Sequence, residues 1–131
     1  MPLQLRVITP TRQLVDAEVE EVTAPGSVGE FGVFPEHVNF IGELQSGILS
    51  YVERGVRKRI VVHGGYAEVV QDVVTVLADD AELPEEIDAA RARQEIQRID
   101  AALAVESEHP ENIDELLSER RRAEVRLAAA S

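Results

Sequence analysis

The sequence has no cysteine and no tryptophan, and only 4% of its 131 residues are aromatic. The absence of cysteine excludes disulfides, thiolate metal sites and a cysteine nucleophile. With so few rings, a core must be built from aliphatic side chains, which the 44% hydrophobic content can supply. We therefore expect an aliphatic core in a chain the size of one ordinary domain, or of a domain with an appendage.

Basic residues are also scarce, with 13 Lys and Arg against 25 Asp and Glu, which gives a net charge of −12. A chain this acidic is repelled by phosphate backbones and anionic headgroups, so we expect no nucleic-acid binding. Its apolar runs are far too short to span a membrane, and its first residues lack the pattern of a secretory signal. Membrane association is therefore expected only through partners.

Up to about residue 84, short β-branched runs alternate with turn signals. Residues 3–8 alternate apolar and polar side chains, as a half-buried strand does. The predicted strands are 3–8, 17–24, 47–53, 57–63, 66–70 and 73–79. Several short strands at this spacing predict an antiparallel sandwich or flattened barrel. The glycine-rich stretch 26–32 lacks the Lys-Ser/Thr of a phosphate-binding loop, so we interpret it as a turn with glycines at positive φ.

From Pro84 the hydrophobic period becomes helical. The first apolar seam consists of Ala89, Ala92, Ile96, Ile99 and Leu103, and the second of Ile113, Leu116, Ala123 and Leu127, interrupted by Arg120. Pro84 suits a helix start, residues 106–112 break the helix, and Asn112 with Glu115 resembles a capping box. The predicted fold class is all-β plus α: an N-terminal antiparallel β-sandwich (1–84) followed by a C-terminal two-helix hairpin (85–131). Because its seam is narrow and Ala-rich, we expect the hairpin to be movable.

A catalytic site is not apparent. His37, His63 and His109 stand in three different local contexts without metal-ligand spacing, so neither a metal site nor a catalytic cofactor has support. The motif of an activated serine, Gly-x-Ser-x-Gly, is absent. The basic trio 57–59 on a predicted strand is interpreted as a solvated face or, alternatively, as a contact for an acidic partner.

The first predicted helix carries a charged stripe beside its seam. Asp88, Arg91, Glu95 and Arg98 repeat at a 3-4-3 spacing. Such a stripe predicts a ladder of intrahelical ion pairs on a solvated surface.

The second predicted helix offers another interpretation of this stripe. Arg122 and Arg126 precede their own seam by one residue, as Arg91 and Arg98 do, so an antiparallel hairpin brings the four guanidinium groups together. Because Arg forks match phosphate oxygens, the closed hairpin is a candidate phosphate or nucleotide site. Glu115 and Glu119 could instead neutralise the cations, and the two interpretations remain open.

Three stretches resemble the epsilon subunit of F-type ATP synthase. GEFGVFPEHVNFIGELQSGILS (29–50) resembles its Gly-Glu-x-Gly-x-x-Pro-x-His segment, and IVVHGGYAEVVQDVVTVLADDAE (60–82) resembles its Ser-Gly-Gly-x-x-Glu-Val and Val-Thr-Val-Leu-Ala-Asp strands. IDAARA (87–92) resembles its Ile/Leu-Asp-x-x-Arg-Ala motif. The resemblance covers nearly the whole chain, with two departures: His63 replaces the usual Ser before two glycines, and Glu36 replaces the usual Gly before His37.

The resemblance implies a non-catalytic subunit of the rotating central stalk. Its sandwich is expected to bind the gamma subunit and the membrane c-ring, with Glu30 toward the c-ring and His37 toward gamma. The hairpin is expected either to rest folded or to extend along gamma into the catalytic head subunits and inhibit ATP hydrolysis. The implied localisation is peripheral, at the cytoplasmic face of a bacterial inner membrane.

Some similar subunits bind ATP in the folded hairpin as a regulatory ligand. The matching positions here are Glu82, Ile87, Asp88, Arg91, Ala92, Arg98, Arg122 and Arg126. The resemblance leaves the magnesium requirement open. The alternative hypothesis is a stand-alone small-molecule-binding β-sandwich module with a helical appendage, which co-purification with a gamma-like partner would distinguish from a rotor subunit.

Overall fold

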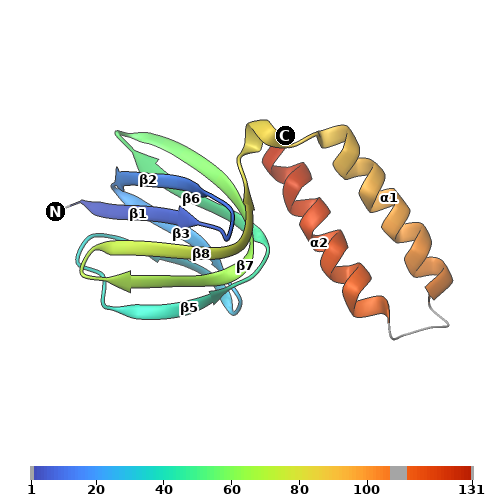
Figure 1. The fold of residues 1–131 in the computed structure, drawn as a ribbon, viewed down its shortest axis with the longest axis horizontal. Helices are drawn as coiled ribbons and strands as arrows, with labels where there is room; N and C mark the ends of the chain where they lie inside the picture. Colours follow the sequence, from blue (N-terminus) through green and yellow to red (C-terminus); the bar gives the residue numbers. More distant parts are fainter. Residues whose placement is uncertain (1, 107–111, 131) are drawn as a thin grey trace. The chain divides into compact units, whose positions relative to one another are not determined.

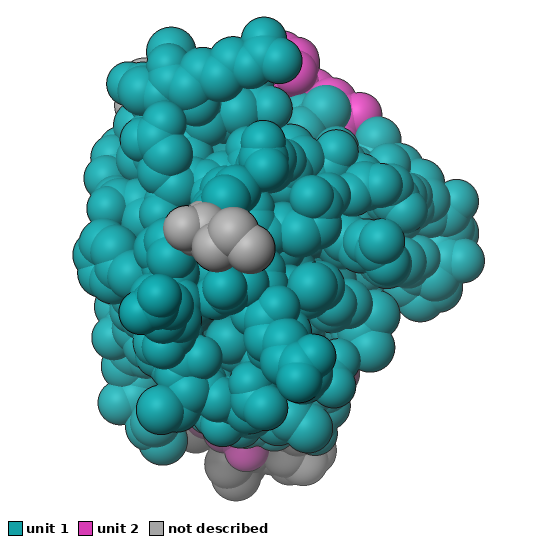
Figure 2. All heavy atoms as spheres, turned by 90° about the vertical axis from the view of Figure 1, so that its left-hand side faces the viewer, with its two compact units in different colours: residues 1–83 teal, residues 84–131 magenta. Residues whose placement is uncertain are grey.

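The structure is a computed structural model that describes residues 2–106 and 112–130. The chain divides into two compact units, residues 1–83 and 84–131, which are coloured separately in Figure 2. His109 and most of the helix break predicted at 106–112 fall on residues 107–111, outside the described residues, while α1 ends at residue 106 and α2 begins at residue 113.

The first unit is an eight-stranded sheet in the order β2-β1-β8-β7-β5-β3-β4, with β6 paired to β3 and β7 (Figure 1). The strands are β1 Leu3–Ile8, β2 Gln13–Val19, β3 Glu21–Gly26, β4 Gly29–Val33, β5 Phe40–Leu44, β6 Gly47–Glu53, β7 Val56–Val70 and β8 Val73–Glu82. Strand β3 pairs with both β5 and β6, and β7 pairs with the same two strands. The sheet therefore folds back on itself, which confirms the predicted β-sandwich. The β1–β8 pairing is parallel, whereas a purely antiparallel sandwich was expected.

The interior of this sandwich is aliphatic, as the composition predicts. In β1, the side chains of Leu3, Leu5 and Val7 alternate inward and are at most 1% exposed. Leu49 of β6 and Ile60 of β7 are fully buried in the same core. Burial of Leu- and Ile-sized side chains at about 2 kcal/mol each is the main force that holds such a core together.

The strand predicted at 17–24 is wrong, because two strands meet there. Strand β2 ends at Val19 and β3 begins at Glu21, with the Glu20 N–H donating to the Val52 carbonyl at 2.8 Å. The chain passes at this point from its partner β1 to its partner β6. The buried positions shift from 15 and 19 to 22 and 24, and this change of phase is the signal that marks the break.

The two strands predicted at 57–63 and 66–70 form a single strand, β7. Gly64 and Gly65, which separate the two predicted strands, lie inside this strand with φ of +71° and +107°. The neighbour of β7 changes there, from β6 at the Gly47–Val62 pair to β5 at the Leu44–Gly65 pair. A Cβ on Gly65 would lie 2.1 Å from the Leu77 carbonyl oxygen, so the position requires glycine. The two glycines therefore mark a change of partner and not a chain reversal.

Strand β4 was missed because the glycine-rich stretch 26–32 suggested only a turn, and β5 at Phe40–Leu44 was not predicted either. The chain does reverse there, between the paired residues Gly26 and Gly29, and Gly29 has a φ of +135°. The predicted turn with a glycine at positive φ is thus confirmed, but β4 follows it directly.

The second unit contains the 3₁₀ turn η1 Pro84–Glu86 and the helices α1 Ala89–Glu106 and α2 Ile113–Ala130 (Figure 1). The expected helix start at Pro84 is wrong: α1 begins at Ala89, and Asp88 is its N-cap. The Asp88 carboxylate accepts the Arg91 N–H at 3.1 Å and so satisfies one of the free backbone donors at the start of the helix. The proline side chain at position 84 provides no such acceptor. Ala92, Ile99 and Ala123 of the predicted seams are buried.

Candidate functional site

An apolar stripe runs across the outer face of the sandwich. Ile8, Leu77 and Tyr66 are register partners on β1, β8 and β7, and Ile41 on β5 is diagonal to Tyr66. Leu77 and Tyr66 are each 54% exposed and Ile41 is 69% exposed. Contiguous exposed apolar side chains on a face with polar neighbours are typical of a protein-binding surface. Sequence reasoning missed this stripe, although the run 73–77 has apolar residues on both faces of its strand.

Two turns meet at one end of the same sandwich. The Glu36 N–H donates to the Asp72 carboxylate at 2.7 Å, and the Gln71 N–H donates to the Asn39 side-chain oxygen at 3.0 Å. Each turn thereby caps the other, which fixes the 34–39 loop against the β7–β8 turn. This loop presents apolar side chains to solvent, with Val38 74% exposed.

His37 belongs to this fixed loop. Its Nδ1 lies 2.7 Å from the Val38 carbonyl oxygen, which only accepts, so Nδ1 carries the proton. The ring is also 5.5 Å from the Phe40 ring, which in turn makes an edge-to-face pair with Phe31 at 5.1 Å. Glu30, the other expected partner contact, is exposed at the start of β4. His37 therefore lies in a loop that is hydrogen-bonded to the β7–β8 turn, whereas Glu30 lies on a strand.

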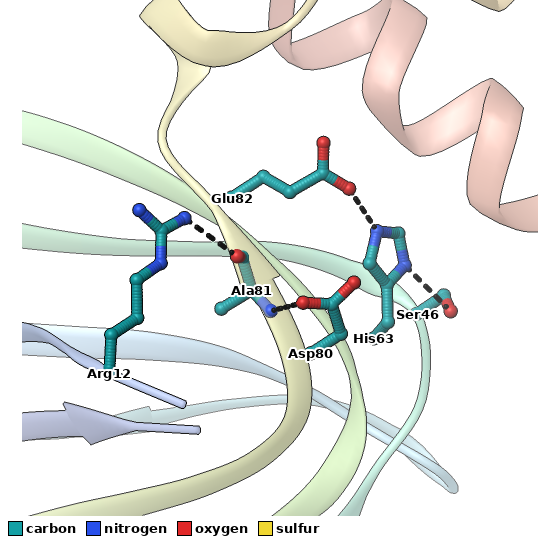
Figure 3. Close-up of polar contacts among 6 residues, drawn as sticks. All are labelled: Arg12, Ser46, His63, Asp80, Ala81 and Glu82. Carbon is teal, nitrogen blue, oxygen red and sulfur yellow. Dashed lines mark hydrogen bonds and ion pairs between the residues drawn. The ribbon is translucent and has the colours of Figure 1, made fainter. Parts of the chain in front are cut away.

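The side chain of Glu82, an expected nucleotide contact, is hydrogen-bonded within the sandwich. Its Oε1 lies 3.0 Å from Nε2 of the buried His63, whose Nδ1 is 3.2 Å from the Ser46 hydroxyl oxygen (Figure 3). Arg12 donates to the carbonyl of the preceding residue, Ala81, at 3.2 Å. The end of β8 is thus held by side chains from two other parts of the sandwich.

The Ile-Asp-x-x-Arg-Ala motif shapes the start of α1. The Ile87 N–H donates to the Pro84 carbonyl at 3.1 Å and closes the 3₁₀ turn, whereas Asp88 caps the helix. Ala92 is 4% exposed in the helix seam, and Arg91 is exposed. The backbone and side chains of this motif therefore shape the start of the helix, and the Arg91 side chain is exposed.

Arg98 contacts carboxylates on both helices. Its Nη2 lies 3.0 Å from Glu95 Oε2 on α1 and 3.3 Å from Glu119 Oε2 on α2. The hydrogen bond that Arg98 donates to Glu95 is the largest cause that raises the pKa of Arg98, followed by the charge of Glu95 and the hydrogen bond donated to Glu119. The Glu95 contact is the predicted intrahelical pair, and Glu119 neutralises Arg98 in the way the alternative interpretation anticipated. Arg122 and Arg126 are half-buried on α2.

Arg120, which interrupts the second seam in the sequence, ties the two helices together. Its Nε and Nη2 lie 2.6 and 3.3 Å from the two carboxylate oxygens of Asp100, and Nη1 contacts Glu124. The hydrogen bond from Arg120 holds the pKa of Asp100 below its usual range. This two-pronged contact was missed because single-helix patterns do not reveal a partner on the opposite helix.

The basic trio 57–59 behaves largely as a solvated face. Arg57 pairs with Glu21, and Lys58 Nζ lies 2.8 Å from Glu53 Oε1. The hydrogen bond that Glu53 accepts from Lys58 lowers the pKa of Glu53. Exposed pairs of this kind contribute little to stability.

The described residues contain no group of three or more His, Cys, Asp or Glu side chains able to hold a metal ion. None of the helices described here combines the length and hydrophobicity needed to cross a bilayer. A β-sandwich with an exposed apolar stripe, followed by an ion-paired two-helix hairpin, is the class of protein that this fold defines.

The chain belongs to the ATP synthase delta/epsilon chain family, whose β-sandwich domain matches residues 2–84. It is 43% identical to the ATP synthase epsilon chain of Solibacter usitatus (strain Ellin6076), over 98% of this chain and 95% of that one. It is also 43% identical to the ATP synthase epsilon chain of Geotalea daltonii, over 77% of this chain and 73% of that one. The predicted membership is thereby confirmed, and with it a non-catalytic subunit of ATP synthase.

Two solved structures have a similar fold. A chain of the Euglena gracilis mitochondrial ATP synthase, from a structure of its OSCP, F1 and c-ring, aligns with a TM-score of 0.73 and 25% identity over 96% of this chain and 75% of that one. A chain of the Tetrahymena thermophila mitochondrial ATP synthase central stalk and c-ring aligns with a TM-score of 0.55 over 64% of this chain and 68% of that one. At 14% identity the second likeness concerns the fold alone.

Proposed function

We propose that this chain is the epsilon subunit of an F-type ATP synthase, a non-catalytic part of the central stalk that couples the c-ring to gamma. Family membership supports this role, as does the fold shared with a chain from an assembly that contains F1 and the c-ring. The subunit would be peripheral, held at the cytoplasmic face of a bacterial inner membrane through the complex.

The apolar stripe is the observation that carries this proposal. Ile41, Tyr66 and Leu77 leave more than half of their side chains in water, an arrangement that a bound partner would relieve. Because strands of a rigid sheet present these side chains, little ordering is required when a partner binds. We assign the stripe to gamma, with His37 as a further contact, and we assign Glu30 to the polar loops of the c-ring.

A binding measurement between the full chain and the gamma subunit of the same organism tests this assignment. Leu77→Glu places a charge at the centre of the stripe and should weaken binding by more than about tenfold, the scale of an interface anchor. Val56→Glu is the matched control, because Val56 is similarly exposed, at 56%, but lies at the far end of β7. Equal affinity of the two variants would show that gamma binds elsewhere.

We further propose that the hairpin is the regulatory arm, which extends toward the catalytic head and inhibits ATP hydrolysis. Its helices are joined by a seam in which two of the three buried predicted residues are alanines, and by exposed ion pairs. A small buried apolar area and solvent-exposed ion pairs hold two helices together only weakly. A rearrangement of this unit therefore requires little free energy compared with unfolding of the sandwich.

ATP is proposed as the ligand that stabilises the folded hairpin. Arg91, Arg98, Arg122 and Arg126 would bind its phosphates, and Arg98 would exchange its carboxylate partners for phosphate oxygens. Asp88 and Ala92 would contribute by shaping the first turn, and Ile87 by closing the turn before it. Glu82 would take part only after leaving His63.

Calorimetry of the isolated full chain with ATP, with and without magnesium, tests the nucleotide proposal. A ligand with higher affinity for the folded hairpin shifts the population toward that form. Measurable binding heat is expected at millimolar ATP or below. Heat equal to that of dilution would exclude the regulatory ligand while leaving the stalk role unaffected.

A further inference from the structure

Glu68 lies inside the exposed apolar face that contains the stripe, and not at its edge. Its strand, β7, lies between β8 and β5 in the sheet (Figure 1). Along β7, the exposed side chains of Tyr66 and Val70 share its face, two residues away on either side. Across the strands, its register partners are Ile41 on β5 and Thr75 on β8. Three of the four residues that flank this exposed carboxylate are therefore apolar.

The chain supplies no partner for this carboxylate. Within the described part of the chain, neither Glu68 nor the exposed Glu43 has an ion pair or a side-chain hydrogen bond. Glu43 is the register partner of Tyr66, so two uncompensated carboxylates flank the β5 end of the stripe. At the β1 end, by contrast, Arg6 Nε lies 3.7 Å from Asp16 Oδ1. The stripe thus has one acidic end and one end where the charges are paired.

A partner that covers the stripe must also cover Glu68. Tyr66 and Ile41 adjoin it on the same face, and both belong to the stripe. A carboxylate that is removed from water without a counter-charge opposes binding, unless the partner supplies a cation or hydrogen-bond donors. A Lys or Arg side chain suits this position, because its aliphatic stem can pack on the apolar neighbours while its charged group contacts the carboxylate.

We propose that Glu68 is the specificity-determining residue of the stripe. It selects an apolar segment of gamma that carries an Arg or Lys side chain, which pairs with Glu68 and has Glu43 as a second acceptor. The pairing rests on the proposed assignment of the stripe to gamma. The apolar side chains supply contact area without direction, whereas the carboxylate fixes the orientation, because only one placement brings the cation to the β5 end.

A second copy of this chain fits the same face poorly. Besides Glu43 and Glu68, the face carries Asp16 and Glu18 on β2, and Arg6 is the cation that lies among them. Two such faces in contact would bring like charges together, which disfavours a dimer through this surface. The charge of the face therefore favours a partner with basic side chains at the contact.

The kinetics of binding between full-chain variants and the gamma subunit of the same organism test the pairing. Glu68→Gln keeps the shape of the side chain but removes its charge, so it leaves the cation of gamma unpaired in the contact. Affinity should fall by about tenfold or more, mainly through faster dissociation, as expected when one member of a covered charge pair is lost.

Glu68→Leu gives a test in which the two outcomes have opposite signs. If gamma places a cation here, Glu68→Leu should bind at least as weakly as Glu68→Gln. If gamma covers the position with neutral groups, removal of the unpaired carboxylate should tighten binding relative to the wild type. Tighter binding of Glu68→Leu would overturn the inference.

Glu18→Gln is the matched control, because Glu18 is an exposed carboxylate on the same face, separated from β7 by β1 and β8. It should retain the wild-type dissociation rate. Equal acceleration in Glu18→Gln and Glu68→Gln would reveal a general effect of net charge and would refute the pairing. Thermal unfolding reports whether each variant keeps its sandwich.

Leu77→Glu separates this inference from the assignment on which it rests. If Leu77→Glu binds gamma weakly while Glu68→Gln behaves like the wild type, the stripe binds gamma and only the pairing is wrong. If Leu77→Glu binds gamma normally, the assignment and the pairing both fail. Dimers of this chain in sedimentation that Leu77→Glu dissociates, without binding to gamma, would assign the face to a second copy and overturn both.

Discussion

Arg120 and Asp100 join the two helices of the hairpin through a two-pronged contact, with Nε–Oδ1 and Nη2–Oδ2 distances of 2.6 and 3.3 Å. A guanidinium that holds both oxygens of a carboxylate fixes the orientation of both side chains. The contact therefore favours one register of α1 against α2, together with the Arg98–Glu119 pair and the buried Ile99.

Replacement of Asp100 by Asn should loosen the hairpin without unfolding it. The neutral amide keeps the size of the side chain but loses the charge that binds Arg120. We expect faster hydrogen exchange in both helices and unchanged exchange in the sandwich strands. Asp114→Asn is the matched control, since Asp114 is an exposed acid in the first turn of α2. Equal exchange in the two variants would mean that the Asp100 contact does not hold the helices.

The hairpin should also loosen in acid. The bond from Arg120 lowers the pKa of Asp100 below the ordinary value of 3.8. A carboxyl whose folded-state pKa is depressed stabilises the fold above its unfolded pKa, and that stability is lost as pH falls through the folded pKa. Helical signal that declines below about pH 4 in the wild type, but is already reduced and flatter in Asp100→Asn, is the expected result. Superimposable pH profiles would contradict it.

Ile99→Ala should strongly destabilise the hairpin. Ile99 is 0% exposed, so truncation leaves a cavity between the helices. Such a change costs about 2–4 kcal/mol, a large part of what a two-helix unit has. Circular dichroism should show lost helix while the strand amides stay protected. Ile41→Ala serves as the control, because Ile41 is 69% exposed and its truncation should change unfolding by less than about 0.5 kcal/mol.

Glu36→Gly should stabilise the sandwich. Glu36 has a φ of 68°, a conformation that strains any residue with a Cβ, while its N–H bond to Asp72 needs no side chain. Relief of that strain, less the greater flexibility of glycine when unfolded, predicts a gain of about 0.5–1 kcal/mol in denaturant unfolding. Glu43→Gly, made at an exposed position in β5, should lose a similar amount. Destabilisation by both variants would show that the strain at Glu36 is negligible.

If ATP binds the hairpin, Arg126→Ala and Arg91→Ala should each weaken binding by about tenfold or more, the effect of losing a hydrogen bond to a charged group. Arg93→Ala is the matched control, because Arg93 is exposed on α1 but does not match the ATP-binding positions. Titration calorimetry measures all three. Unchanged affinity in Arg91→Ala and Arg126→Ala would place the nucleotide away from these arginines.

The class of each half of the fold was determined by the sequence alone. The change from short β-branched runs to a 3.6-residue period near Pro84 is a local property, because side-chain alternation reflects one element at a time. The N-cap at Asp88 could also have been predicted from the sequence, because an aspartate directly before a helical pattern is a strong start signal. Pro84 favours an earlier start, because proline is common at the first position of a helix, but α1 begins at Ala89.

Only the tertiary structure decided which residues meet. The Gly64–Gly65 pair has the same local signature whether the chain reverses or changes neighbours, and the register with β5 and β6 settles which occurs. Likewise, Arg120 interrupts an apolar seam in the sequence, whereas in the structure it pairs with Asp100 on the other helix. Glu82 matched a nucleotide-binding pattern, yet folding places the buried His63 against its carboxylate. Pairings between residues far apart in the chain depend on packing, which no period in a single sequence encodes.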